Sequence, residues 1–220
     1  MDVAALWLTL RLALVTTAVL LAISVPLACW LAFGRSRLRT PVQAVCALPI
    51  VLPPTVLGFY LLVALGPQTS LGRAITHWLG HPLAFSFSGL VVGSVIYSLP
   101  FALQPLVAGL GAVDHSLLDA AATLGSGPVM RIVRVALPLS RSSLIAASVL
   151  AFAHTVGEFG VVLMIGGNLP GTTRTLSIAL YDQVQDFNYA QANRTALVLL
   201  AVCFTALIAL YSRRSRGELV

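Results

Sequence analysis

Charged residues are scarce in this sequence, and lysine is absent altogether. Charged residues make up 9% of the 220 positions, whereas 58% are hydrophobic, and the mean hydropathy is +0.95. A soluble globular domain typically carries about 25% charged residues. The composition therefore excludes an ordinary soluble domain and indicates an integral membrane protein. The net charge is +6, but the sequence does not offer the basic face on a soluble surface that nucleic-acid binding requires.

Cysteine is rare too, and its three copies, Cys29, Cys46 and Cys203, all lie in apolar runs. Their spacing fits neither a metal site nor an extracellular disulfide framework, so we interpret them as packing residues. No GxxxxGK[ST] motif is present, which excludes ATP hydrolysis through a phosphate-binding loop. Without tandem repeats, low-complexity segments or interdomain linkers, residues 1–220 are expected to form a single transmembrane domain.

Long apolar runs dominate what remains. A hydrocarbon layer about 30 Å thick requires about 20 apolar residues per helix. The runs that approach or exceed this length carry no charge apart from Glu158, and they are Leu12–Phe33, Pro41–Gly72, Pro82–Val113, Ser142–Thr173 and Thr195–Ser212. We predict an all-α protein with about five transmembrane helices.

Arginines predict the orientation of these helices. They cluster after the first run, between the third and fourth runs, and after the fifth: Arg35, Arg37, Arg39, Arg131, Arg134, Arg141, Arg213, Arg214 and Arg216. With five spans, all three clusters fall on the same side, which the positive-inside rule assigns to the cytoplasm. The N-terminus is then expected outside and the C-terminus in the cytoplasm.

One polar, arginine-bearing segment, residues 116–138, separates the third and fourth runs, and its sequence predicts two short helices in a hairpin. Ser116 and Asp119 have the spacing of a capping box, so a helix is expected to start at Leu117. Gly125 is expected to end it in the left-handed conformation. Ser126 and Pro128 suit the start of a second helix, which carries Arg131 and Arg134 and ends before Pro138. An ordinary polar connector is the alternative.

The spacing within this hairpin resembles the EAA loop of ABC-transporter permeases, the cytoplasmic element that docks on the ATP-hydrolysing subunit. The resemblance covers the Asp-Ala-Ala triplet, the glycine after it and the later Leu-Pro pair. It implies a coupling hairpin at 114–138 whose contact residues are Ser116, Asp119, Ala120, Ala121, Gly125, Arg131, Leu137 and Pro138. Aspartate at 119 departs from the family's usual glutamate, which keeps the charge and shortens its reach.

Polar residues inside the apolar runs are candidates for a pathway or gate. Thr55 and Ser98 lie beside prolines that interrupt helices, as does Gln104, and such neutral donors suit a transiently bound anion. His154 and Glu158 are four residues apart and are expected to share a helix face. A charged residue at membrane depth is a functional candidate. A structural pair or a gating hydrogen bond is favoured for these two, and a metal-ligand pair is the least expected because no cysteine or second acid lies nearby.

The run GEFGVVLMIGGNLPGTTRTLSIALYD, residues 157–182, together with LPIVLPPTVLGFYLL, residues 48–62, resembles the molybdate permeases. The resemblance implies an ABC importer type I permease fold in the cell inner membrane and import of molybdate or tungstate. It also implies a second permease copy and two ATPase subunits on the cytoplasmic side. ATP and Mg²⁺ belong to those ATPase subunits, and this chain is expected to hold no cofactor or metal.

The same resemblance implies an extracytoplasmic oxyanion-binding protein as a partner. The loop from Gly166 to Arg194 and the shorter loop from Arg73 to His81 are expected to face it. Within the longer loop, the proposed contact residues are Asn168, Arg174, Asp182 and Asp186.

Three other functions compete with this interpretation. A sulfate or thiosulfate ABC permease would share the same architecture. A proton-coupled secondary transporter would use His154 and Glu158 as a relay, but five spans cannot divide into the equal halves of an inverted repeat. A membrane-bound enzyme would need a nucleophile, a base and an orienting residue on one face, and the sequence does not provide them.

Overall fold

The computed structural model describes residues 2–217, which form helices and connecting segments without any strand. In chain order the elements are α1 (Val3–Phe33), α2 (Arg39–Val51), α3 (Pro54–Leu65), α4 (Ser70–Leu79), α5 (Phe87–Gly111), α6 (His115–Thr123), α7 (Pro128–Arg131), the π-helical turn η1 (Ile132–Ala136), α8 (Leu137–Leu139), α9 (Arg141–Gly157), α10 (Gly160–Gly166), α11 (Leu176–Gln185) and α12 (Tyr189–Gly217). The all-α prediction is confirmed.

Side-chain caps start several of these helices. Asp2, Thr69, Ser86 and Thr175 precede α1, α4, α5 and α11, and each accepts a hydrogen bond from the amide three residues on. Such caps satisfy amides that have no partner within the helix. The caps therefore determine where four helices begin, and this does not depend on packing between helices.

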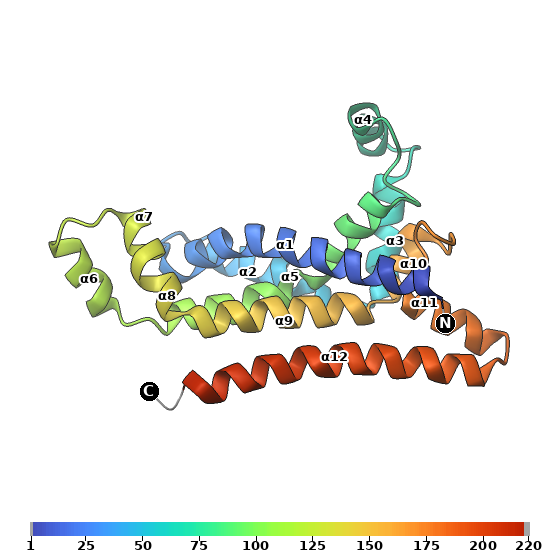
Figure 1. Ribbon diagram of the computed structural model, residues 1–220. Helices are drawn as coiled ribbons and strands as arrows, with labels where there is room; N and C mark the ends of the chain where they lie inside the picture. The colour runs from blue at the N-terminus through green and yellow to red at the C-terminus, as the bar shows by residue number, and fades with distance from the viewer. Residues whose placement is uncertain (1, 218–220) are drawn as a thin grey trace.

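The centre of the molecule is formed by α1, α5 and α9, which pack side by side (Figure 1). The main apolar cluster lies toward one end of this bundle and joins Leu31 of α1, Leu106 and Leu110 of α5 and Ala147 of α9. The small alanine on α9 brings the helices close together, because little side chain separates their backbones. The helix α12 runs along α9, and few of its residues up to Ser212 are buried, as expected for a helix at the edge of a membrane bundle.

Two of the candidate membrane spans are bent pairs of helices: Arg39–Val51 with Pro54–Leu65, and Pro128–Leu139 with Arg141–Gly157, which meet at 74°. The helices α1, α5 and α12 are each long and apolar enough to cross a membrane, and the number reaches five when each of two bent pairs counts as one span. The helices α2 and α3 meet at 112°, because Leu52 and Pro53 each precede a proline and are extended. The predicted fourth run is also not a single helix: α9 ends at Gly157, and α10 begins at Gly160.

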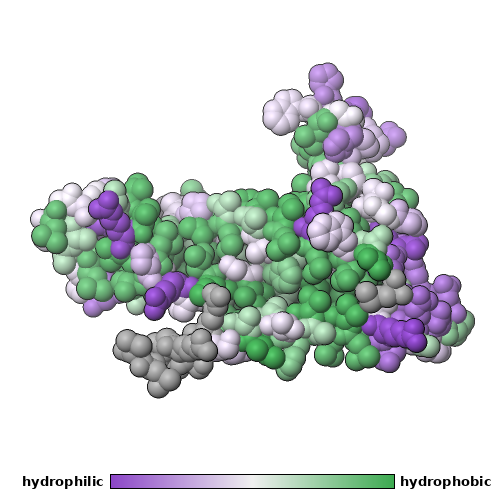
Figure 2. Space-filling model, viewed as in Figure 1, coloured by the Kyte–Doolittle hydropathy of each residue, from purple (hydrophilic) through white to green (hydrophobic). Residues whose placement is uncertain are grey.

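The two ends of the bundle are polar and its middle is apolar. Figure 2 shows hydrophobic surface over the long helices and hydrophilic residues toward both ends and on the protruding α4. The hairpin of α6 to α8 lies at the same end as the last turns of α12, whereas the N-terminus, α4, α10 and α11 lie at the other (Figure 1). The side chains of Arg213, Arg214 and Arg216 lie outside the described residues. The assignment of the hairpin end to the cytoplasm stays a prediction.

Candidate functional site

The hairpin between α5 and α9 begins with an aspartate cap. The Asp114 Oδ1 accepts a 2.8 Å hydrogen bond from the Ser116 amide, and α6 starts at His115. That hydrogen bond lowers the pKa of the Asp114 carboxyl below its ordinary value. The predicted capping box of Ser116 and Asp119 was therefore wrong. The amide that Asp119 was to satisfy is already bonded to Asp114, and Asp119 lies exposed within the helix.

Gly125 ends α6 as predicted. Its φ of +81° is left-handed, the Ser126 amide donates to the Ala121 carbonyl at 3.0 Å, and the Gly125 amide donates to the Ala122 carbonyl at 2.9 Å. This pair of hydrogen bonds is the Schellman motif, which turns the chain sharply after a helix. Gly125 thus fixes the corner between the two halves of the hairpin.

The second half of the hairpin differs from its prediction. Gly127, not Ser126, precedes α7, and the helix does not end before Pro138 but continues through it to Leu139. The continuation is possible because residues 132–136 form a π turn, in which the Leu137 amide donates to the Ile132 carbonyl. The wider turn comes just before Pro138, which has no amide hydrogen to donate.

Apolar packing holds the hairpin against the bundle. Leu118 of α6 and Ala136 of η1 are buried in the same cluster as Leu110 of α5. The rings of Phe33 in α1 and His115 in α6 also meet edge to face, with centroids 6.2 Å apart. Because both halves share the core of the long helices, a force applied to the hairpin is transmitted to the membrane-spanning helices.

The outer face of the hairpin is apolar and exposed. Asp119 and Ala120 lie on it, and its large exposed side chains are Leu117, Leu124, Val129, Met130 and Val133. Arg131 is half-buried and Arg134 is exposed beside them. Exposed large apolar side chains gathered on one segment are typical of a protein contact, and docking of a partner on the hairpin stays a prediction.

A second group of predicted residues meets between α5 and α9. The Ser98 hydroxyl lies 2.8 Å from Nδ1 of His154 and 3.2 Å from the Thr155 hydroxyl. The His154 ring stacks on Phe101 with centroids 3.8 Å apart, and Tyr97 lies 5.0 Å away. Thr55 is not part of this group; it lies exposed at the start of α3, where its amide approaches Gly160.

Glu158 does not share a helix face with His154, which corrects the sequence prediction. It follows the last residue of α9 in an extended conformation, with ψ of 133°, and its carbonyl accepts a hydrogen bond from the Ser177 hydroxyl at 2.5 Å. Its side chain is 4% exposed and lies close to the Ser94 hydroxyl, without a hydrogen bond of normal geometry. The break between α9 and α10 places Glu158 outside the helix that carries His154, and within the described residues no hydrogen bond or ion pair joins the two side chains.

The opposite end of the bundle carries the predicted contact residues for a binding protein. Arg174 Nε donates to Asn168 Oδ1, and Asn168 Nδ2 donates to Asp182 Oδ2, both at 2.6 Å, while Arg174 and Asp182 also form an ion pair at 3.6 Å. Asp186 lines the same polar hollow of about 370 Å³ as Arg174 and Asp182. The predicted longer loop is interrupted by α11, which occupies residues 176–185 and carries Asp182, and α4 likewise occupies most of the predicted shorter loop.

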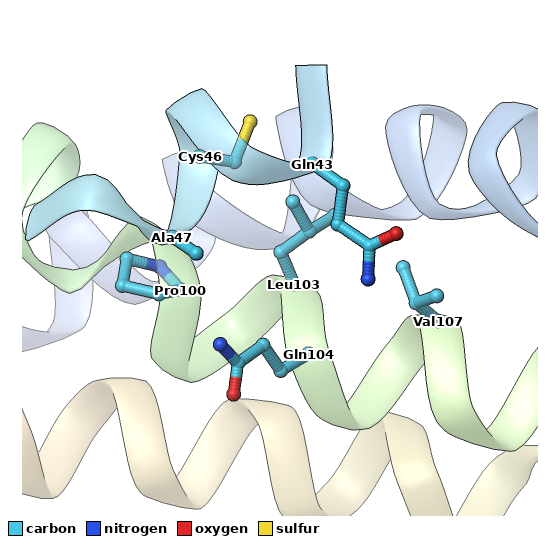
Figure 3. Close-up of a pocket in the computed structure, with 7 residues that line it drawn as sticks. All are labelled: Gln43, Cys46, Ala47, Pro100, Leu103, Gln104 and Val107. Atoms are coloured by element: carbon cyan, nitrogen blue, oxygen red, sulfur yellow. The ribbon is translucent and has the colours of Figure 1, made fainter. Parts of the chain in front are cut away.

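Sequence reasoning missed two features. Asp114 is a strong N-cap residue type two positions before the predicted cap, so residue preference alone could have found it. Gln43 of α2 lines a small cavity with Gln104 of α5 (Figure 3); its signal was a lone amide inside an apolar run. Among the described residues, no group of three or more histidine, cysteine, aspartate or glutamate side chains is placed to hold a metal ion.

Long apolar helices with a hairpin packed against one end of the bundle define a multi-span membrane protein. The chain belongs to the family of binding-protein-dependent transport system inner membrane components, whose family model matches residues 24–217. The resemblance to ABC permeases drawn from the sequence is therefore confirmed, and the chain is an inner-membrane protein of this family.

Curated relatives are similar over nearly the whole chain. The molybdenum transport system permease protein ModB of Azotobacter vinelandii is 52% identical over 214 residues, covering 97% of this chain and 94% of the relative. ModB of Escherichia coli (strain K12) is 33% identical over 207 residues, covering 92% and 90%.

Solved structures share the fold at low sequence identity. A chain of the MetNI methionine ABC transporter in an inward-facing conformation aligns with a TM-score of 0.74 at 17% identity, covering 99% of this chain and 95% of that one. A chain of a bacterial alginate ABC transporter, in complex with its pentasaccharide-bound periplasmic protein, aligns with a TM-score of 0.77 at 17% identity, covering 94% and 76%. The expected ABC importer permease fold is confirmed.

Proposed function

We propose that this chain is the membrane-spanning subunit of an ATP-driven importer for molybdate, moved by a separate ATPase through the hairpin at residues 114–138. The similarity to the molybdenum transport permeases supports the substrate. The observation that carries the mechanism is the hairpin itself, which is exposed and apolar outside and joined to α1 and α5 inside.

The partners of the chain follow from the same reasoning. Two permease copies form a pair, one ATPase subunit binds under each hairpin, and ATP and Mg²⁺ are held by those subunits. The hairpin contact consists of Ser116, Asp119, Ala120, Ala121, Gly125, Arg131, Leu137 and Pro138. An oxyanion-binding protein docks at the opposite end, where Arg174, Asn168 and Asp182 are joined and Asp186 is exposed.

ATP binding draws the two ATPase subunits together, and each hairpin moves with its subunit as a rigid body. Because Leu118 and Ala136 are packed against Leu110, that motion reaches α5 and the helices packed around it. Hydrolysis then resets the hairpins. The chain itself contributes mechanical coupling and a path, and no chemistry.

Reconstitution tests this proposal. The chain is placed in proteoliposomes with its ATPase and binding protein, and ATP hydrolysis is measured with molybdate, tungstate or sulfate. We expect molybdate with binding protein to stimulate hydrolysis and to accumulate inside. Stimulation by sulfate alone would replace the proposal with a sulfate permease, and uptake without the ATPase would replace it with a secondary transporter.

The hairpin is tested separately with Ala120→Trp, which places a bulky ring on its exposed face. We expect loss of ATPase binding and of uptake, with the permease still folded by its thermal unfolding. An attached ATPase and normal uptake in this variant would show that the hairpin is not the coupling element.

A further inference from the structure

Two glutamines line a cavity between α2 and α5, within the membrane-spanning part of the chain. The cavity is walled by Gln43, Cys46, Ala47, Pro100, Leu103, Gln104 and Val107. In Figure 3 the Gln43 side chain reaches from α2 toward α5, and the Gln104 amide lies beside α5. About 80 Å³ of this space is open to water-sized molecules, and a single water needs only about 10–15 Å³ by this measure.

The two amides are exposed, and neither has a hydrogen-bond partner among the described residues. An unpaired amide facing hydrocarbon is strongly disfavoured, so polar side chains at membrane depth line a wet path or meet another polar group. Lipid therefore cannot be what normally covers Gln43 and Gln104.

Two prolines leave backbone carbonyls of α5 without a hydrogen-bond donor. Pro100 and Pro105 have no amide hydrogen, so the carbonyls of Ile96 and Phe101 lack the usual donor four residues on. In a membrane helix such freed groups are tolerated where water or another polar group reaches them. Of the two prolines, Pro100 lines the cavity, so the α5 wall includes a turn whose backbone is not fully hydrogen-bonded within the helix.

The charge around the cavity favours an anion over a cation. Neither α2 nor α5 contains an acidic residue. The nearest charge along α2 is Arg39, one helical turn before Gln43, and its guanidinium donates hydrogen bonds to the Ala32 and Gly34 carbonyls. Each glutamine offers two neutral N–H donors, which bind the oxygen atoms of an anion less tightly than an arginine in the cavity would.

We propose that Gln43 and Gln104 form a transient binding site for a tetrahedral oxyanion, on the way from the membrane centre to the hairpin end. The position fits, because α2 starts and α5 ends at that end of the bundle (Figure 1). This inference rests on the proposed function and names a substrate site within it.

Cys46 supplies a direct test, because its thiol lines the same cavity. A chain with Cys29→Ala and Cys203→Ala keeps Cys46 alone, and a matched chain with Cys29→Ala and Cys46→Ala keeps Cys203, which lies in α12 away from the cavity. Both are assembled with ATPase and binding protein in proteoliposomes and treated with a water-soluble maleimide. We expect Cys46 to react with the maleimide, and to react several-fold more slowly while molybdate is being transported. The reaction rate of Cys203 is expected to be the same with and without molybdate.

Uptake gives the second readout. The double variant Gln43→Leu, Gln104→Leu removes four donors, and we expect molybdate uptake to fall about tenfold with ATPase binding unchanged. Gln68→Leu, on the exposed connection before α4, is the matched control and is expected to transport normally. Glutamate in place of Gln104 adds a repelling charge and should lower uptake further.

The outcomes separate the two proposals. Molybdate uptake by the unaltered complex, together with an inert or molybdate-insensitive Cys46 and normal uptake by the double leucine variant, would overturn the glutamine site and leave the importer standing. Absence of molybdate uptake by the unaltered complex would overturn the proposed function itself.

Discussion

The Ser98 hydroxyl and the His154 ring nitrogen Nδ1 lie 2.8 Å apart, and this hydrogen bond joins α5 to α9 across 56 positions of sequence. Ser98 is fully buried, and His154 is enclosed by the rings of Phe101 and Tyr97. A polar link of this kind aligns two helices rotationally, because only one arrangement of the pair satisfies both groups.

Ser98→Ala is expected to destabilise the protein by about 1–2 kcal/mol, because it leaves a buried imidazole nitrogen without its partner. Thermal unfolding in detergent measures the loss. Ser148→Ala is the control, since the Ser148 hydroxyl bonds only to the Leu144 carbonyl of its own helix. Equal unfolding temperatures for the two variants would contradict a structural role for the Ser98 and His154 pair.

Gly125→Leu is expected to weaken ATPase binding about tenfold, because a side chain in the left-handed conformation costs about 1–2 kcal/mol. Nothing lies within 4 Å of the space its Cβ would occupy, so the effect comes from the backbone alone. Gly125→Asn should recover most of the binding, since asparagine tolerates this conformation. Gly111→Ala, also without neighbours and without a positive φ, should bind normally.

Gly160→Ala is expected to lower stability by about 1–3 kcal/mol through overpacking. Its Cβ would lie 2.8 Å from Cβ of Pro54, forcing α10 away from the start of α3. Gly157→Ala is the matched control three residues earlier, because no atom lies within 4 Å of its Cβ position. A larger loss of thermal stability in Gly157→Ala than in Gly160→Ala would contradict close packing between α10 and α3.

Asp114→Ala is expected to speed hydrogen exchange at the Ser116 amide, whereas Ser116→Ala should leave exchange in the first turn of α6 nearly unchanged. Asp114→Asn should preserve the cap, because asparagine caps equally well. Since folding lowers the pKa of Asp114, its stabilisation is complete above the ordinary value of 3.8 and is lost as the pH falls through the lowered value. The asparagine variant should lack this pH dependence, and exchange spectra across pH would show it.

Glu158→Gln is expected to assemble and transport like the unaltered chain. Among the described residues no cation pairs with the buried carboxyl, so an ionised side chain would be uncompensated, whereas the amide keeps the shape and adds a donor near Ser94. Uptake of molybdate and thermal unfolding are measured together. Loss of uptake in a stable Glu158→Gln protein would show that a titrating acid is needed, as a proton-coupled transporter requires.

Residue preferences predicted correctly those parts of the hairpin whose conformation depends on a single residue type. Only glycine enters the left-handed region freely, so Gly125 was identified correctly. The start of α6 was wrong because Asp114 and Ser116 are both good caps, and choosing between them depends on where the chain leaves α5. The end of the second helix was wrong because a π turn at 132–136 carries the helix through Pro138.

The amino-acid order alone determined that this protein lies in a membrane, how many times its apolar runs can cross it, and where the polar hairpin interrupts them. These properties depend on the hydrophobicity summed over a run of neighbouring residues, and that sum is the same however the chain folds. Only the tertiary structure decided that Ser98 faces His154, that Glu158 lies outside the helix that carries His154, and that Gln43 shares a cavity with Gln104. Those pairings depend on how each helix is rotated and where it breaks, and these are set by packing between segments far apart in the chain.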